Sequence, residues 1–336
     1  MSQTLVLTGI TGFIAKNVAL NALNRGHSVR GTLRSPRRAD EVRAALAPHL
    51  TDRAALDRLS FHVADLGGIG GWAEAMAGAD ALLHTASPFP LAQPKDEQEL
   101  IRPAVEGTTR VLRAALAAGI RRAVLTSSTA AVLDERKQGE QDERDWCQPD
   151  LPTTSAYSKS KVLAEQAAWE IAGATDLALT TINPGLVLGP PLDAQYGSSL
   201  NLVLRLLKGK DPALPLIGFP VVDVRDIAEM HLRALEQPET AGQRFIGSAG
   251  SLSMPQMAAI LKAAYPQRRI PTRTAPRWLL RVMALWDAEV RTILPQVGMI
   301  PSVSSTAARR DLRMDFIPAD QALLASAAWL IEQGQV

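Results

Sequence analysis

The sequence first becomes informative at Thr4-Leu5-Val6-Leu7-Thr8-Gly9-Ile10-Thr11-Gly12-Phe13-Ile14-Ala15, where an apolar run leads through a glycine turn into an amphipathic segment. Such a turn lets backbone approach a pyrophosphate, because glycine has no side chain to collide with it and the next helix offers unpaired N–H groups. The spacing is Gly-x-x-Gly-x-x-Ala, and no Gly-Lys-Ser/Thr follows, which excludes a P-loop. A purely structural turn is the alternative that this stretch leaves open.

Five further apolar runs alternate with segments of helical spacing over the first 180 residues or so, as in parallel strands joined by helical crossovers. We predict an α/β fold, a Rossmann-type doubly wound parallel sheet with a smaller, mainly helical C-terminal substrate domain. The expected strands are residues 4–7, 28–33, 61–64, 81–84, 123–126 and 178–182. The expected helices are 13–23, 41–46, 71–76, 97–118 and 157–171, with a kink at Pro103 in the fourth.

Prolines and glycines crowd the sequence after residue 182, which indicates a domain boundary. We expect the dinucleotide-binding domain over residues 1–182, with 219–247 returning to it, because 216–224 reads as a strand and 226–235 as a helix. The substrate-binding domain is then 183–218 together with 248–336. Apolar residues at helical spacing over 278–286 favour a core helix there, and the lining of a substrate pocket is the alternative.

Composition excludes several classes of function. The chain has 336 residues, 46% of them hydrophobic, and 36 Lys+Arg against 34 Asp+Glu, an excess too small to suggest nucleic acid as a partner. Cys147 is the only cysteine, and the five histidines lack metal-ligand spacing, so we expect neither an intramolecular disulfide nor a metal site. No signal-peptide pattern and no apolar run near 18 residues is present, so we expect no membrane association and a cytoplasmic location.

The end of the second expected strand reads Arg30-Gly31-Thr32-Leu33-Arg34-Ser35-Pro36-Arg37-Arg38, with four arginines and no acidic residue. In a dinucleotide fold this position faces the adenosine ribose, where an acid would hold a 2′-hydroxyl and an arginine would hold a 2′-phosphate. A solvated basic loop is the alternative. The position favours NADP(H) as cofactor, with Arg34 as the first candidate for the contact.

Tyr157 and Lys161 lie four residues apart, so both project from one face of the expected helix. An ammonium near a phenol stabilises the phenolate, which helps a tyrosine to donate a proton to a carbonyl oxygen. An exposed helix pair is the alternative, although the chain has only three tyrosines. Ser128 follows the fifth expected strand, at the carboxyl edge where open α/β sheets bind their ligands.

These segments together resemble the extended short-chain dehydrogenase/reductases over most of the chain. Supporting stretches are Val63-Ala64-Asp65-Leu66, Leu83-His84-Thr85-Ala86-Ser87-Pro88 and Asn183-Pro184-Gly185-Leu186-Val187-Leu188-Gly189-Pro190. The resemblance implies that Ser128, Tyr157 and Lys161 are catalytic. It implies that the cofactor is bound by Gly9, Thr11, Gly12, Phe13, Ile14, Arg34, Asp65, Leu66, Thr85, Ala86, Ser87, Thr126, Tyr157, Lys161, Pro184, Gly185 and Val187.

Within the family, the sequence is most similar to the branch of dihydroflavonol reductases and yeast-type aldehyde/ketone reductases. It departs from flavonol-type reductases, which carry Asn five residues after the catalytic Ser where this chain has Leu133, and it lacks the Asn-Trp-Tyr-Cys-Tyr element of cinnamoyl-CoA reductases. These departures argue against a polyphenol or thioester substrate. Phe89 and Tyr196, on loops expected to face the crevice, are the expected substrate contacts.

The resemblance implies a monomeric or homodimeric enzyme that uses NADPH to reduce a small aldehyde or ketone reversibly to an alcohol. Two other functions stay open at this point. One is a nucleotide-sugar epimerase or dehydratase on the same fold, which a strong preference for NADH would favour. The other is a non-enzymatic NADP-sensing regulator, which tight NADP(H) binding without turnover would favour.

Overall fold

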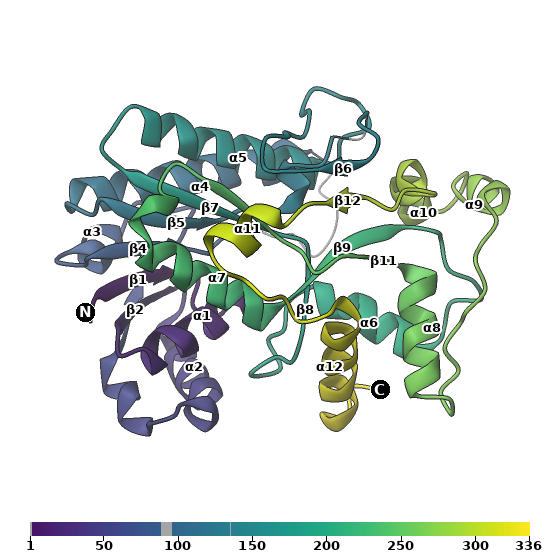
Figure 1. Cartoon of the computed structure of the whole chain (residues 1–336), viewed down its shortest axis with the longest axis horizontal. Helices are drawn as coiled ribbons and strands as arrows, with labels where there is room; N and C mark the ends of the chain where they lie inside the picture. Colours follow the sequence, from purple (N-terminus) through teal and green to yellow (C-terminus); the bar gives the residue numbers. More distant parts are fainter. Residues whose placement is uncertain (1, 89–95, 135) are drawn as a thin grey trace.

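The computed structural model describes residues 2–88, 96–134 and 136–336 (Figure 1). Within these residues a central sheet of seven parallel strands has the order β10-β7-β5-β4-β1-β2-β3, which confirms the predicted doubly wound α/β fold. β10 is a seventh strand beyond the six that the sequence indicated. The strands are β1 (Thr4–Thr8), β2 (Ser28–Leu33), β3 (Leu59–Val63), β4 (Ala81–His84), β5 (Arg122–Thr126), β7 (Ala178–Pro184) and β10 (Arg244–Gly247).

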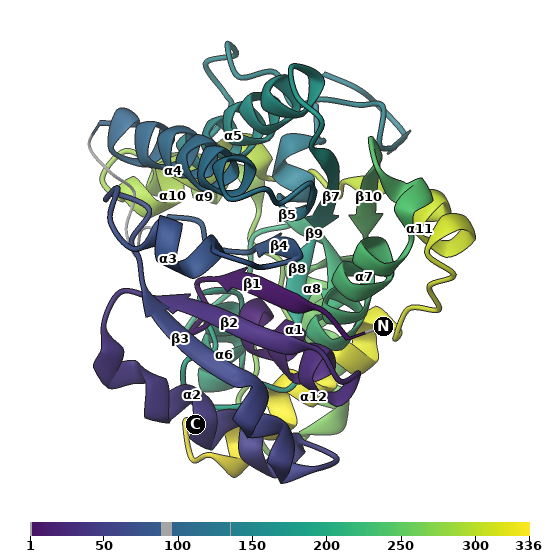
Figure 2. The same cartoon turned by 90° about the vertical axis from the view of Figure 1, so that its left-hand side faces the viewer.

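Helices cover both faces of this sheet (Figure 2). One face carries α1 (Phe13–Asn24), α2 (Ala39–Leu46) and α7 (Val224–Glu236), and the other carries α3 (Trp72–Met76), α4 (Gln98–Ala117) and α5 (Ala156–Gly173). Pro103 lies in the second turn of α4, and the helix continues on both sides of it. None of the helices in the described part of the chain has both the length and the apolar character of a membrane span.

β1 shows why the sheet needs helices on both sides. Successive side chains of a strand point to opposite faces, and every second residue of β1 joins a different apolar cluster. Leu5 and Leu7 are fully buried in the cluster that contains α1 and α7, while Val6 is fully buried in the cluster on the α3 and α4 side. The continuous apolar run therefore encodes a central strand with two covered faces.

A second, smaller sheet lies beside the carboxyl ends of the central strands (Figure 1). Its strands are β8 (Leu186–Leu188), β9 (Gly218–Asp223) and β11 (Ser251–Ser253), with β9 parallel to β8 and antiparallel to β11. Three helices pack around it: α6 (Ser199–Lys208), α8 (Met254–Ala264) and α12 (Ala319–Glu332). The remaining elements are β6 (Glu140–Gln141), α9 (Arg277–Met283), α10 (Ala288–Ile293), β12 (Ser302–Val303) and α11 (Thr306–Asp311).

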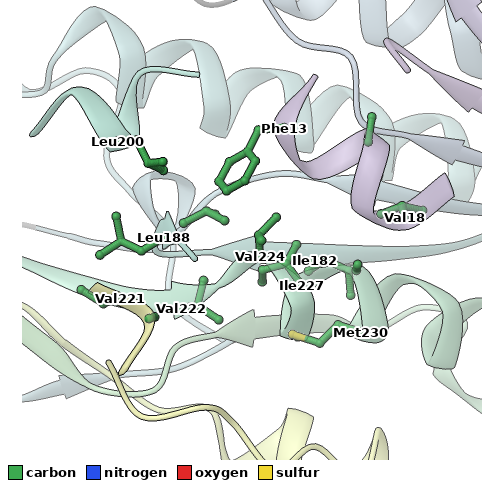
Figure 3. Close-up of a cluster of buried hydrophobic side chains, with 14 of the residues drawn as sticks. Phe13, Val18, Ile182, Leu188, Leu200, Val221, Val222, Val224, Ile227 and Met230 are labelled. Carbon is green, nitrogen blue, oxygen red and sulfur yellow. The ribbon is translucent and has the colours of Figure 1, made fainter. Parts of the chain in front are cut away.

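The segment expected to return to the first domain divides between the two sheets. β9 belongs to the small sheet, whereas α7 and β10 pack on or join the central sheet. A single apolar cluster connects both parts (Figure 3), with Phe13 and Val18 from α1, Leu200 from α6 and Ile227 from α7 packed in it. The domain boundaries given above stay a prediction, since this core is continuous across them.

The apolar stripe over residues 278–286 is largely exposed, so the prediction of a core helix there is wrong. Trp278 and Trp286 are 66% and 71% exposed, and Leu285 is exposed as well, while Leu280 is buried against Ile217 in a small satellite cluster. Helical spacing locates one face of a helix, but it does not say which structure covers that face.

Asp226 attaches the C-terminal segment to the central domain. It lies in the first turn of α7, and its Oδ2 accepts a hydrogen bond of 2.8 Å from the backbone N–H of Ile317. Burial raises the pKa of Asp226 to about 6, and the negative charge of Asp223 adds to this effect. An unfolded aspartate has a pKa of about 4. Between about pH 4 and about pH 6, the folded protein therefore keeps a proton on Asp226 that the unfolded chain releases. The stability of the folded protein falls as the pH rises through this range.

We therefore expect Asp226→Asn to stabilise the folded protein more at alkaline than at acidic pH. The amide oxygen can still accept the hydrogen bond from the N–H of Ile317, but the amide never ionises. The difference in unfolding free energy between the variant and the unmodified protein should be about 1 kcal/mol larger, in favour of the variant, at about pH 8 than at about pH 5. Denaturant unfolding at both pH values measures it. Asp320→Asn, an exposed first-turn aspartate of α12, is the control and should show no such rise. A pH-independent effect of Asp226→Asn would contradict the assignment.

Candidate active site

The glycine turn between β1 and α1 leaves room at the carboxyl edge of the sheet. Gly9 has φ +65°, and a Cβ at this position would lie 3.0 Å from the Cβ of Ala86. Gly12 is the N-cap of α1 and supplies no side chain to cap it, so the first-turn N–H groups have no capping acceptor. A bare helix N-terminus behind a close-packed glycine turn is a favourable place for an anionic ligand.

A buried hydroxyl fixes this turn against the loop that follows β4. Thr8 Oγ1 accepts hydrogen bonds from the N–H groups of Thr85, at 3.1 Å, and Ala86, at 3.0 Å, and lies 2.7 Å from His84 Nδ1. Because both lone pairs of the hydroxyl are used, its proton goes to His84 Nδ1, which places the imidazole proton on Nε2. Burial, helped by the charge of Lys161, lowers the pKa of His84 to about 3, so the ring is neutral at physiological pH.

α5 presents the predicted Tyr157 and Lys161 on one side. The helix begins at Ala156, and its N-cap Ser155 accepts a hydrogen bond of 3.1 Å from the N–H of Ser158. Lys161 Nζ donates to Ser87 Oγ at 3.0 Å and lies 5.7 Å from the centroid of the Tyr157 ring. The ammonium is therefore held between the tyrosine and the loop after β4.

Ser128 lies just beyond the end of β5 and is 9% exposed. Its Oγ accepts a hydrogen bond of 3.1 Å from the N–H of Ala130, which caps a short 3-10 turn, and its carbonyl accepts one of 3.2 Å from Asn183 Nδ2. These bonds fix the serine from both its side chain and its backbone.

Ser128 and Tyr157 line one cavity of about 1170 Å³ together with the glycine turn. That volume is at or above the usual upper range for a small-molecule site and leaves space for more than one ligand. The structure thus brings together residues from the β1–α1 turn, the segment after β5, α5 and the β7–β8 connection. The predicted site residues that line this cavity are Gly9, Gly12, Phe13, Ile14, Thr85, Ser128, Tyr157, Gly185, Val187 and Tyr196.

The other predicted cofactor residues lie around this cavity or further along the sheet edge without lining it. Ala86, Ser87 and Lys161 stand directly behind it through the contacts described above. Thr126 has its hydroxyl occupied, because it lies 2.6 Å from Nε2 of His231, a buried ring whose Nδ1 faces a carbonyl at 2.7 Å. Burial lowers the pKa of His231 to about 4. The predicted cofactor residues not among those lining the cavity are Thr11, Arg34, Asp65, Leu66, Ala86, Ser87, Thr126, Lys161 and Pro184.

Arg34 is exposed immediately after β2 and forms no ion pair among the described residues. Arg38, by contrast, pairs with Glu41 at 2.9 Å. Asp65 lies just after β3, where its Oδ1 accepts from the N–H of Gly67 at 2.8 Å, and the side chain of Leu66 packs against the α4 backbone at Gly107. Arg34 is thus one exposed cation near this edge without an ion pair in the described part of the chain, as is Arg37, and Asp65 is a carboxylate nearby.

Part of the cavity lining is apolar, and most of this part comes from residues that the sequence did not identify. Leu133, Leu186, Leu202, Ile217, Phe219 and Met299 line it. Residues 217–219 and 298–302 reach the site only through the packing of the small sheet, so no local pattern marks them. Tyr196 lines the same cavity and meets Trp329 edge-on at 5.6 Å. Phe89, the other expected substrate contact, lies outside the described residues.

Lys16 is a supporting residue that sequence reasoning missed. It is 1% exposed on α1, three residues after Phe13, and its ammonium bonds the carboxylate of Asp193 and the carbonyl of Gln195, the latter at 3.3 Å. Burial lowers the pKa of Lys16, and the partnership with Asp193 opposes that effect. The ion pair ties the loop that carries Tyr196 to the helix of the glycine turn. The sequence did contain a signal for this buried ion pair, because Lys16 is a charged residue within an otherwise apolar face of the helix.

Residues 5–246 match the family described as the NAD dependent epimerase/dehydratase family. The chain therefore belongs to this family, the extended short-chain dehydrogenase/reductases, which confirms the resemblance inferred from the motifs. Among the described residues no group of three or more His, Cys, Asp or Glu side chains is arranged to hold a metal ion.

Similar proteins include reductases from plants and yeast. The chain is 33% identical to cinnamoyl-CoA reductase 1 of Petunia hybrida, over 99% of this chain and 94% of that protein. It is 33% identical to dihydroflavonol 4-reductase of Zea mays, over 80% of this chain and 76% of that protein. Among solved structures, yeast methylglyoxal/isovaleraldehyde reductase Gre2 complexed with NADPH is similar with a TM-score of 0.81 and 26% identity, over 99% of this chain and 100% of that one.

The hydrogen bonds of Thr8 lead to a prediction about the turn. Thr8→Val keeps the shape of the side chain but leaves two backbone N–H groups and His84 Nδ1 without their partner. We expect the unfolding free energy to fall by about 2–4 kcal/mol and dinucleotide affinity to fall with it. Denaturant unfolding and a fluorescence titration measure the two effects. Thr4→Val, in the same strand, is the control and should change the free energy little; equal losses in both variants would argue against this role of Thr8.

Proposed function

We propose that the protein is an NADPH-dependent carbonyl reductase that converts an aldehyde or ketone to an alcohol, reversibly. The observation that carries the proposal is the convergence of Ser128 and Tyr157 on one cavity with the glycine turn, with Lys161 held directly behind Tyr157. Serine, tyrosine and lysine in this arrangement can bind and protonate a carbonyl oxygen.

The residues present fit a dinucleotide. A Cβ at Gly9 would crowd Ala86, so the close-packed turn needs glycine there, and Gly9 and Gly12 both line the cavity. The uncapped N-terminus of α1 offers N–H donors to a pyrophosphate. Arg34 would hold the 2′-phosphate of NADPH, Asp65 would face the adenine, and the backbone at Gly185 and Val187 would adjoin the nicotinamide. The similarity to Gre2, crystallised with NADPH, supports the same choice of cofactor.

When bound, NADPH supplies the hydride that the carbonyl carbon accepts. Ser128 Oγ donates a hydrogen bond to the carbonyl oxygen and polarises it. The Tyr157 hydroxyl gives its proton to that oxygen as negative charge develops there. The ammonium of Lys161 stabilises the tyrosinate that remains, and its contact with Ser87 keeps it facing the cofactor side of the site.

The apolar residues of the cavity lining favour a carbonyl substrate with a hydrophobic substituent. Leu133 lines the cavity at the position where flavonol-type reductases carry Asn, so a polar ring system would lose a partner there. We therefore propose small or medium-sized hydrophobic aldehydes and ketones, rather than polyphenols or thioesters, as the substrate class.

Replacing Tyr157 tests the proposal most directly. Tyr157→Phe removes the proton donor while keeping the ring, and turnover should fall by about 10²–10⁴. The measurement is NADPH consumption with a panel of aldehydes and ketones. Tyr265→Phe, at the end of α8 and away from the cavity, is the control and should keep full activity. Near-normal turnover of Tyr157→Phe would contradict the proposed mechanism. Tight NADP(H) binding without turnover in the unmodified protein would favour the alternative of a non-enzymatic NADP sensor.

The cofactor preference is predicted to depend on Arg34. Arg34→Ala should weaken NADPH binding by roughly 10- to 150-fold and leave NADH binding almost unchanged, because only NADPH has the 2′-phosphate. Dissociation constants for both nucleotides provide the ratio. Arg53→Ala, at another exposed arginine, is the matched control. A strong preference of the unmodified protein for NADH would instead favour the alternative function of a nucleotide-sugar epimerase or dehydratase.

A further inference from the structure

Glu165 is a buried carboxylate on α5, one helical turn beyond Lys161, and its side chain is 0% exposed. The mechanism above gives it no role, yet five side chains donate to it. Arg244 Nε lies 2.7 Å from its Oε1, and Thr181 Oγ1 and Trp169 Nε1 approach the same oxygen at 3.0 and 3.3 Å. Ser127 Oγ and Asn183 Nδ2 approach Oε2 at 2.5 and 2.8 Å.

Two of these donors control the position of Ser128. Ser127 directly precedes it, so the bond to Glu165 fixes the residue on one side of the proposed carbonyl-binding serine. Asn183 Nδ2 bonds both Glu165 and the carbonyl oxygen of Ser128, the latter at 3.2 Å. The same carboxylate oxygen thus holds the backbone of Ser128 from both sides, and Ser128 lines the cavity.

Arg244 balances the buried charge and extends the network to the wall of the site. Its NH1 donates to the carbonyls of Glu143 and Asp145 at 2.7 Å each, and its guanidinium lies 3.7 Å from the centroid of the Trp146 ring. The next residue, Cys147, lines the cavity. Both oxygens of the Glu165 carboxylate and most donors of Arg244 have hydrogen-bond partners. Such a buried ion pair contributes more to fixing the positions of its neighbours than to the stability of the fold.

We propose that Glu165 is a positioning residue, which holds Ser128 at the distance and orientation from which its hydroxyl can bond the substrate carbonyl. This inference rests on the proposed function, because it acts through Ser128. Glu165 itself lies outside the lining of the cavity and contacts no reacting atom. Its effect should therefore appear in the rate of the chemical step and not in cofactor affinity.

The test is a double-mutant cycle of Glu165→Gln with Ser128→Ala, read as single-turnover reduction rates with NADPH. Glu165→Gln should lower the rate about 10-fold while the dissociation constant for NADPH changes less than about 2-fold. In the Ser128→Ala background the same substitution should change the rate less than about 2-fold, because the group that Glu165 positions is absent. A merely structural role would lower the rate equally in both backgrounds, and that result would overturn the proposal.

Two further variants keep the test decisive. Ser127→Ala removes one bond to Glu165 and leaves the ion pair intact, so it should show the same dependence on Ser128 even if Glu165→Gln folds poorly. Glu170→Gln, exposed on the same helix, is the matched control and should change nothing. If Ser128→Ala itself has normal rates, the proposed function fails; if Ser128→Ala is impaired but Glu165→Gln and Ser127→Ala are not, only the positioning role fails.

Discussion

The hydroxyl of Thr8 joins the first strand to the loop after β4, and the rest of the site depends on this contact. Two backbone N–H groups and one neutral histidine converge on a single buried oxygen. The contact brings Ala86 against Gly9, where only a hydrogen can occupy the space of a side chain. It also places Ser87 where Lys161 can reach it, so the cofactor turn and α5 are linked through one loop.

Buried polar groups that have few alternative hydrogen-bond partners fix other segments around the cavity. Lys16 and Asp193 fix the loop of Tyr196, while Glu165 gathers donors from β5, β7 and β10. Unpaired polar groups in such surroundings are costly, so each network has one strongly preferred arrangement. These networks fix the glycine turn, the loop after β4 and the segment of Ser128 relative to one another.

Much of the fold followed from local patterns. β2 and β4 match the predicted ranges. β4 is a short, mainly apolar run that is buried throughout, as expected for a strand covered on both faces. β10 did not appear in the prediction, since it is only four residues long and begins with a charged residue, Arg244, whose charge is balanced by Glu165. The stripe around Trp278 was misassigned because periodicity carries no information about what lies opposite.

The sequence by itself determined the class of fold, the family and the chemical groups at the site, because a glycine turn, a Tyr-x-x-x-Lys spacing and a serine at a strand end are local patterns with local physical causes. Only the tertiary structure decided which residues surround those groups. Leu133, Phe219 and Met299 line one cavity although they lie far apart in the chain, and Glu165 reaches Ser128 through Asn183. Such contacts arise from the packing of two sheets, which no short stretch of sequence encodes.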